Sequence, residues 1–312
     1  MNTQPNVVPE FGSESRAVTA RVIPETERFF WLEKRELWEN RSIYLGPLGV
    51  ATLFLFGFLI SAFHLPARMR ELAGMDPEHY RHAVAAPYDM VAGMMMFVTV
   101  LVNLFYCIDA LYGERRDRSI LFWKSLPVSD TATVLSKASI PLLVVPLVTW
   151  AITVALQWIM LLVSSVVLLG SGLSVATLWT RLSFFQMSLL LLYHLFTAHT
   201  LWPAPVYCYL LLVSGWARRA VLMWAALPLV AISGLELIIF HTSHFAIMVG
   251  SRLIGLSEHG ATYAPADVFP TNPMAHVTPF HFLRTPGLWI GLVIGAVFLF
   301  AAIRVRRERG PI

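Results

Sequence analysis

Charged residues are scarce in this 312-residue chain: they make up 13% of it, whereas hydrophobic residues make up 57%. Soluble proteins carry a charge on roughly a quarter of their residues, so a soluble fold of this length could not hide so much apolar surface from water. A lipid bilayer accepts such a surface. The composition therefore excludes an ordinary soluble protein and predicts a single membrane domain.

Cysteine is also rare. The two present, Cys107 and Cys208, each lie within an apolar run, so we expect no structural disulfide. Residues 1–25 lack an apolar core and a small-residue cleavage site, and they predict a mobile cytoplasmic tail and no signal peptide. The net charge of +4 comes from basic residues beside apolar segments, which favours the lipid bilayer as a partner and argues against nucleic acid.

Several motifs that carry chemistry are missing. The sequence contains no phosphate loop of the form G-x-x-x-x-G-K-[ST], no G-x-S-x-G and no H-E-x-x-H. Two histidine pairs have i, i+3 spacing, His79/His82 and His241/His244, but no cysteine or acidic cluster completes a site, so we predict no metal. These absences argue against an enzyme and against ATP binding by this chain.

Long apolar runs dominate what is present. They predict an all-α membrane protein whose domain, residues 43–303, contains six spans: 43–63, 89–111, 138–169, 182–216, 220–240 and 286–303. The fourth run would reach about 50 Å as one straight helix, against a hydrocarbon core of roughly 30 Å. Pro203 and Pro205 lie in its middle, so we predict one kinked helix there. The alternative, a tight hairpin of two spans, would reverse every segment downstream.

The positions of the basic residues favour six spans. With that topology, 17 of the 23 Lys and Arg residues lie on one side of the membrane, together with both termini and the basic tail 304–312. Basic residues concentrate in cytoplasmic segments, so we predict cytoplasmic termini and a location in a bacterial inner membrane.

Residues 26–42 form a second pattern. At about 100° per residue the bulky side chains share one side of a helix, and they are Phe30, Trp31, Leu37 and Trp38. Glu33, Glu36 and Glu39 fall on the other side. This arrangement predicts an amphipathic helix in the membrane interface, with its tryptophans at headgroup depth.

The segment between spans two and three, residues 112–137, changes abruptly from charged residues to bulky apolar residues. It opens YGERRDRSILFWKSLPVSD, a charged block followed by four apolar residues and a Leu-Pro turn. A plain connecting loop needs no such anchor, whereas a docking element for a soluble partner would use one. A short helix lying on the membrane explains the pattern equally well.

This segment, together with WPAPVYCYLLLVSGWARRA after the fourth run, resembles the permease subunit of bacterial ABC exporters of the ABC type-2 class. The resemblance implies that two such chains, as a homodimer, assemble with two copies of a separate ATPase subunit that holds ATP and magnesium, and that this chain needs no cofactor. It also implies short re-entrant helices in the outer loop 241–285, near residues 242–256. The implied ATPase contacts are Glu114, Arg115, Arg116, Asp117, Arg118, Leu121, Trp123, Lys124 and Leu126.

Glu236 lies deep in the fifth span, where a charge is costly. It either faces a transport pathway or subunit interface, or it is a protonated carboxyl hydrogen-bonded to a neighbouring helix. Rival functions are a secondary carrier, or another polytopic membrane protein without an ATPase partner. No half-to-half symmetry supports the carrier. The sequence does not identify a cargo.

Overall fold

The computed structural model describes residues 24–72, 74, 76–125, 128–181, 184–254 and 279–309. Within these ranges every regular element is a helix and no strand occurs. The first half of the chain contains α1 (Glu25–Glu39), α2 (Ser42–Ala62), α3 (Leu65–Leu72), α4 (Pro77–Asp109), α5 (Tyr112–Arg116), α6 (Ser119–Ser125), α7 (Asp130–Ser139), the π-helix η1 (Ile140–Val144) and α8 (Val145–Gly170). The second half contains α9 (Ala176–Arg181), α10 (Phe184–Phe196), the π-helix η2 (Thr197–Leu201), α11 (Ala204–Trp216), α12 (Val221–Phe240), α13 (His244–Ile254), α16 (Pro279–Arg284) and α17 (Pro286–Glu308).

Five helical stretches in the described part of the chain are long and apolar enough to cross a membrane. They are Ser42–Ala62, His82–Arg116, Asp130–Gly170, Val221–Phe240 and Pro286–Glu308. Each overlaps one predicted span, so the structure agrees with an all-α membrane protein, while the count of six spans stays a prediction.

The fourth predicted span is not a single helix. Residues 182–216 divide into α10, η2 and α11, and none of the three is long enough to cross a bilayer alone. The break falls at Trp202 and Pro203, where proline supplies no backbone donor to the preceding turn. The prolines were therefore correctly predicted to interrupt this run, but the interruption is a break between η2 and α11 and not a kink within one helix.

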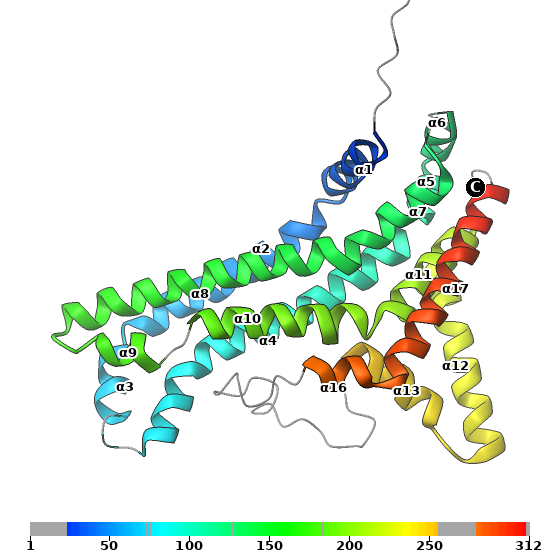
Figure 1. Cartoon of the computed structure of the whole chain (residues 1–312). Coiled ribbons are helices and arrows are strands. Elements are labelled where there is room, and N and C mark those ends of the chain that lie inside the picture. The colour runs from blue at the N-terminus through cyan, green and yellow to red at the C-terminus, as the bar shows by residue number, and fades with distance from the viewer. Residues whose placement is uncertain are drawn as a thin grey trace, which may run out of the picture.

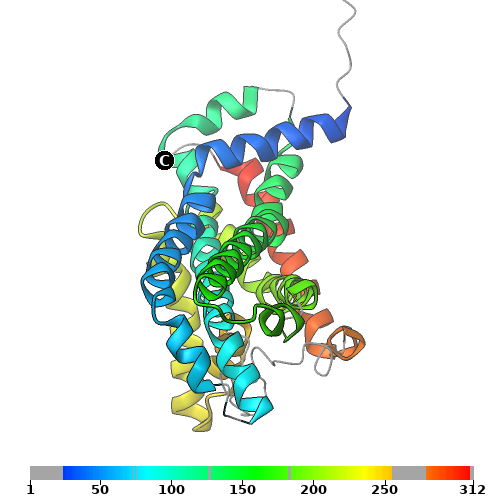
Figure 2. The same ribbon diagram turned by 90° about the vertical axis from the view of Figure 1, so that its left-hand side faces the viewer.

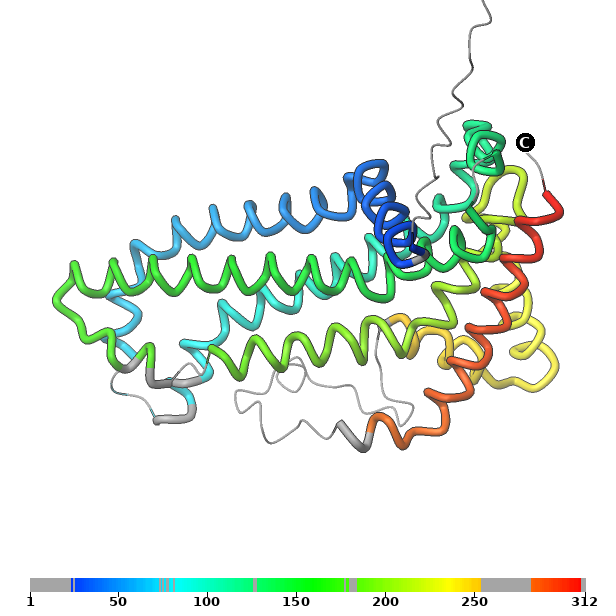
Figure 3. The backbone as a smooth tube through the Cα atoms, turned by 45° about the horizontal axis from the view of Figure 1, so that its top comes forward, coloured from blue at the N-terminus to red at the C-terminus, as the bar shows by residue number. Residues whose placement is uncertain are grey.

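The helices form two groups that splay apart (Figures 1 and 3). In the first group α2 packs on α4 and α8, and α10 packs on α8; in the second, α11 packs on α17 and α12. The groups converge at the end of the molecule that carries α1, α5, α6, α7 and the last turn of α17, which we call the charged end. Figure 2 shows α1 lying across this end. A buried apolar cluster, including Ile43, Cys107, Val145, Tyr207 and Val221, joins both groups there.

Loops predicted from the sequence contain more helix than expected. α4 begins at Pro77, before the predicted start of span two at residue 89. The predicted outer loop 64–88 also contains α3, and the loop 241–285 contains α13 and α16. A short helix near residues 242–256 is confirmed by α13, while its insertion into the membrane stays a prediction. The predicted tail 1–25 lies outside the described residues except for its last two positions.

Candidate functional site

The helix α1 presents two different faces. The side chains of Phe30, Trp31 and Trp38 are all more than half exposed, as expected for a helix in a membrane interface. Leu37 was predicted to share that exposed face, but it packs against the buried apolar cluster. The acidic face contacts the protein: Glu36 is fully buried, and Glu33 accepts a hydrogen bond from Ser139 at 2.7 Å.

Glu36 is buried because Lys137 of α7 meets it. The Lys137 ammonium lies 2.9 and 3.0 Å from the two carboxylate oxygens of Glu36, and both side chains are at most 2% exposed. The Tyr106 hydroxyl of α4 donates to the same carboxylate at 3.0 Å, and Asn40 donates at 3.4 Å. A charge in a protein interior requires such pairing, since its desolvation costs several kcal/mol.

Glu114 of α5 extends this pair into a network. Its carboxylate lies 3.2 Å from the Lys137 ammonium and 3.0 Å from the Arg35 guanidinium. Arg306 of α17 donates to the other oxygen of Glu114 and also pairs with Asp130 at 3.1 Å. Three acidic and three basic side chains are thus joined, and we call them the ion network: Arg35, Glu36, Glu114, Asp130, Lys137 and Arg306. It ties α1, α5, α7 and α17 together at the charged end (Figure 1).

Arg35 connects the ion network to α6. Burial works to lower the pKa of Arg35, but the carboxylates of Glu36, Glu39 and Glu114 outweigh burial and hold the pKa above its ordinary value. The side chain therefore stays cationic. Its guanidinium carbon lies 3.8 Å from the ring centre of Trp123, a cation–π contact.

The short helix α5 is interlocked with the end of α11. The Ser214 hydroxyl accepts hydrogen bonds from the backbone N–H groups of Leu111 and Tyr112, at 3.0 and 2.9 Å, where α4 gives way to α5. In return, the Arg115 guanidinium donates to the carbonyl oxygens of Gly215 and Ala217, at 2.7 and 3.0 Å. Each helix end satisfies polar groups of the other.

The next helix, α6, is held at several points but leaves an apolar surface free. Ile120 is buried, and Lys124 donates to the carbonyl oxygens of Arg307 and Arg309 at the end of α17. Leu121 and Phe122, by contrast, are 57% and 59% exposed. The outermost charged side chains lie between α5 and α6, where Arg116 pairs with Asp117 at 3.0 Å.

The residues predicted as ATPase contacts therefore separate into two sets. Glu114 and Arg115 are buried within this chain, so no partner can reach them, and we assign them to internal contacts. The exposed residues are Arg116, Asp117, Arg118, Leu121 and Lys124, with Trp123 half-buried. Leu126 lies outside the described residues. Sequence reasoning missed Glu36, Lys137 and Arg306 as a site; a lone lysine at the start of an apolar run was the available signal.

Glu236 has a structural role at the end of α12. Its carboxylate accepts hydrogen bonds from the Thr242 hydroxyl at 2.8 Å and from the backbone N–H groups of His244 and Phe245 at 2.9 and 2.8 Å. These amides open α13, and a carboxylate is the favoured group at a helix N-terminus. Of the two interpretations offered by the sequence, the hydrogen-bonded one matches this geometry in its partners but not in its protonation, because Glu236 accepts all three hydrogen bonds as a carboxylate. The pathway role stays a prediction.

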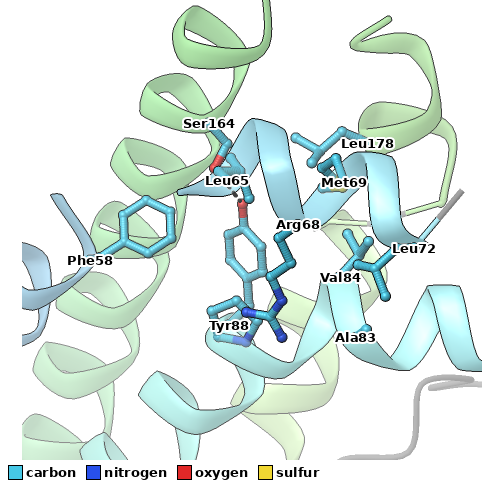
Figure 4. A pocket seen from close by; sticks show the side chains of 11 residues that line it. Phe58, Leu65, Arg68, Met69, Leu72, Ala83, Val84, Tyr88, Ser164 and Leu178 are labelled. Carbon is cyan, nitrogen blue, oxygen red and sulfur yellow. Dashed lines mark hydrogen bonds between the residues drawn. The ribbon is translucent and has the colours of Figure 1, made fainter. Parts of the chain in front are cut away.

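The opposite end of the first helix group contains a small cavity (Figure 4). Phe58, Arg68 and Tyr88 lie around it, and the Tyr88 hydroxyl is 3.4 Å from that of Ser164. Its volume of about 20 Å³ suits a single water molecule and no larger ligand. Within the described ranges no group of three or more His, Cys, Asp or Glu residues could hold a metal ion.

The charged end is thus the best-defined polar site of the described chain: a buried ion network with an exposed apolar helix above it. No protein-family model matches this chain, and no curated protein matches it either. The function proposed below is therefore supported by the geometry of this site and by the sequence resemblance.

Proposed function

We propose that this chain is the membrane-spanning permease subunit of an ATP-driven exporter of the ABC type-2 class. One observation carries the proposal: α6 exposes Leu121 and Phe122 while Trp123 and Lys124 fasten it to α1 and α17. An ATPase subunit that binds this helix would supply the ATP and magnesium, and this chain would supply the path through the membrane.

The surface of α6 suits a soluble protein partner. An apolar pair bordered by charges provides an anchor that a partner's pocket can bury and a rim that selects the partner. Arg116, Asp117 and Arg118 form that rim, and all three are exposed. A helix resting on lipid can carry the same charges, so docking is favoured by the additional contacts that fasten α6 to α1 and α17.

The connections of α6 suit mechanical coupling. A displacement of α6 acts on Arg35 through Trp123 and on the end of α17 through Lys124. Through Glu114 and Ser214 it also acts on α7, α4 and α11, which belong to both helix groups. Closure of two ATPase subunits would therefore tilt the two groups relative to each other and open a path.

In this proposal the charged end faces the cytoplasm of a bacterium, and two copies of the chain pair within the inner membrane. The exposed tryptophans of α1 would lie among lipid headgroups. A secondary carrier would need none of these links to a soluble partner, so transport by this chain alone after reconstitution would contradict the proposal.

Site-directed cross-linking tests the docking surface. Both native cysteines, Cys107 and Cys208, are buried, so a thiol reagent reacts with a cysteine introduced on the surface and not with the native ones. We expect Phe122→Cys to cross-link to a co-expressed ATPase with a phosphate loop, identified by mass spectrometry of the product. Phe63→Cys is the matched control, because Phe63 is 83% exposed at the opposite end of α2.

The same two variants test the orientation. Phe122→Cys should resist a membrane-impermeant thiol reagent added to intact cells and react once the cells are opened. Labelling of Phe122→Cys from outside intact cells would overturn both the orientation and the docking assignment.

A further inference from the structure

A hollow of about 400 Å³ lies beside the last two turns of α17. One stripe of α17 at helical spacing lines it, together with Thr131 of α7, and the stripe consists of Phe300, Ile303, Arg304, Arg307 and Glu308. Specific small-molecule sites typically have volumes of roughly 300–1,000 Å³, so the hollow can hold a ligand group of substantial size. It is separate from the ion network, since Arg306 points to the other side of α17 and pairs with Glu114 and Asp130.

The hollow changes character along its length. One part of its lining is apolar, formed by Phe300, which is 68% exposed, and by Ile303. The other part is polar and lies nearer the end of α17, formed by the guanidinium groups of Arg304 and Arg307 and by the Thr131 hydroxyl, which accepts a hydrogen bond from Arg307 at 3.3 Å. Glu308 pairs with Arg304 at 3.2 Å, and the lining as a whole contains two cations and one anion.

The length of α17 predicts that the boundary between these parts falls at the membrane surface. The apolar stretch of α17 from residue 286 to residue 303 extends about 27 Å at 1.5 Å per residue, close to the thickness of the hydrocarbon core. In a helix that crosses the bilayer along its normal, Phe300 and Ile303 would lie where acyl chains end, and Arg304 and Arg307 would lie at the depth of phosphate groups.

We propose that this hollow binds an anionic phospholipid. The headgroup phosphate would accept hydrogen bonds from Arg304 and Arg307, and an acyl chain would lie along Phe300 and Ile303. Guanidinium groups match phosphate oxygens in geometry as well as in charge. A free phosphate shares the headgroup chemistry but gains nothing from the apolar part, so the order of apolar and basic residues favours the lipid.

Native mass spectrometry of the full chain in detergent tests the proposal. The probes are dioleoyl phosphatidylglycerol, the zwitterionic dioleoyl phosphatidylcholine with the same acyl chains, and inorganic phosphate. We expect the wild-type chain to bind phosphatidylglycerol most tightly, and the double variant Arg304→Gln, Arg307→Gln to bind it roughly 30-fold more weakly.

The matched control is Arg218→Gln, Arg219→Gln. These arginines are exposed at the charged end and lie outside the hollow, so the control removes the same charge. It should keep wild-type binding of phosphatidylglycerol. Equal losses in the two double variants would reduce the effect to general charge attraction and overturn the proposal.

A second variant guards against misfolding and separates lipid from free anion. Phe300→Ser leaves every charge in place, and it should weaken phosphatidylglycerol binding while leaving any binding of inorganic phosphate unchanged. Inorganic phosphate that competes fully with the lipid would indicate an anion site and overturn the proposal. The proposal would also be overturned if the masses showed that the arginine double variant had lost a bound second copy of the chain and no lipid.

Discussion

The charged end and α12 differ in how far their side chains are covered by the rest of the chain. At the charged end, six ionised side chains from four helices are paired within the chain, and four of them are less than 10% exposed. Among the described residues α12 is covered much less, because only Val221 and Ala225 of its twenty residues are buried. The charged end is thus specified by contacts within the chain, whereas α12 leaves most of its apolar surface exposed.

The largest effect should come from breaking the central ion pair. Lys137→Met removes the buried ammonium that contacts both carboxylate oxygens of Glu36 and also pairs with Glu114, so we expect the free energy of unfolding in detergent micelles to fall by about 3–5 kcal/mol. Lys124→Met removes an exposed ammonium and should cost less than about 1 kcal/mol. The double variant Glu36→Leu, Lys137→Met should be less destabilised than Lys137→Met alone, because no unpaired charge remains at that position.

Two neighbouring acids on the same segment sharpen the contrast between buried and exposed charge. Glu114→Gln loses charge-assisted hydrogen bonds from Arg306 and Arg35 and the ion pair with Lys137, and we expect a loss of about 1.5–3 kcal/mol in unfolding free energy. Asp117→Asn changes an exposed residue and should stay within about 0.5 kcal/mol of wild type. Similar losses in both variants would show that burial of Glu114 does not set its contribution.

A smaller effect is expected at the junction of α5 and α11. Ser214→Ala removes the acceptor of two backbone N–H groups and should lower the unfolding free energy by about 1–2 kcal/mol. Hydrogen exchange should rise at the amides of Leu111 and Tyr112. Ser233→Ala is the control, since the Ser233 hydroxyl donates only within its own helix, to Leu229; it should leave stability unchanged.

The smallest effect should occur on α12. Ile238→Ala truncates a side chain that is 73% exposed within the chain, so we expect a change within about 0.5 kcal/mol when the protein is monomeric in detergent. Unfolding at increasing protein concentration provides the measurement. A loss of more than 2 kcal/mol that appears only at high concentration would mean that a second copy, and not lipid, covers this helix.

Much of the fold could be predicted from the sequence because membrane insertion is decided locally. The composition of an apolar run such as 43–63 is enough to predict a membrane span. The prolines at 203 and 205 likewise mark the break in the fourth run. The site could not be predicted in the same way. Glu36 and Lys137 are 101 positions apart, and nothing near either residue indicates the other.

Capping and packing roles were hidden for a similar reason. Glu236 looked exceptional within an apolar helix because its partners belong to the next turn and helix, whose geometry depends on where α12 ends. The acidic face of α1 looked like a water-facing surface, since the residues that cover it come from α4 and α7. Helical periodicity identifies a face but not what that face contacts.

The contact between α13 and α17 has a consequence for how the splayed helices can move. Arg252 extends from α13 over Gly291, donates to the carbonyl oxygens of Trp202 and Gly287, and lies 4.5 Å above the ring centre of Trp202. The Arg252 side chain thus connects α13, the turn at Trp202 and the start of α17, which are far apart along the chain. Any larger residue at position 291 would displace the Arg252 guanidinium. Gly291 therefore preserves the contacts that hold the start of α17 against the break between η2 and α11.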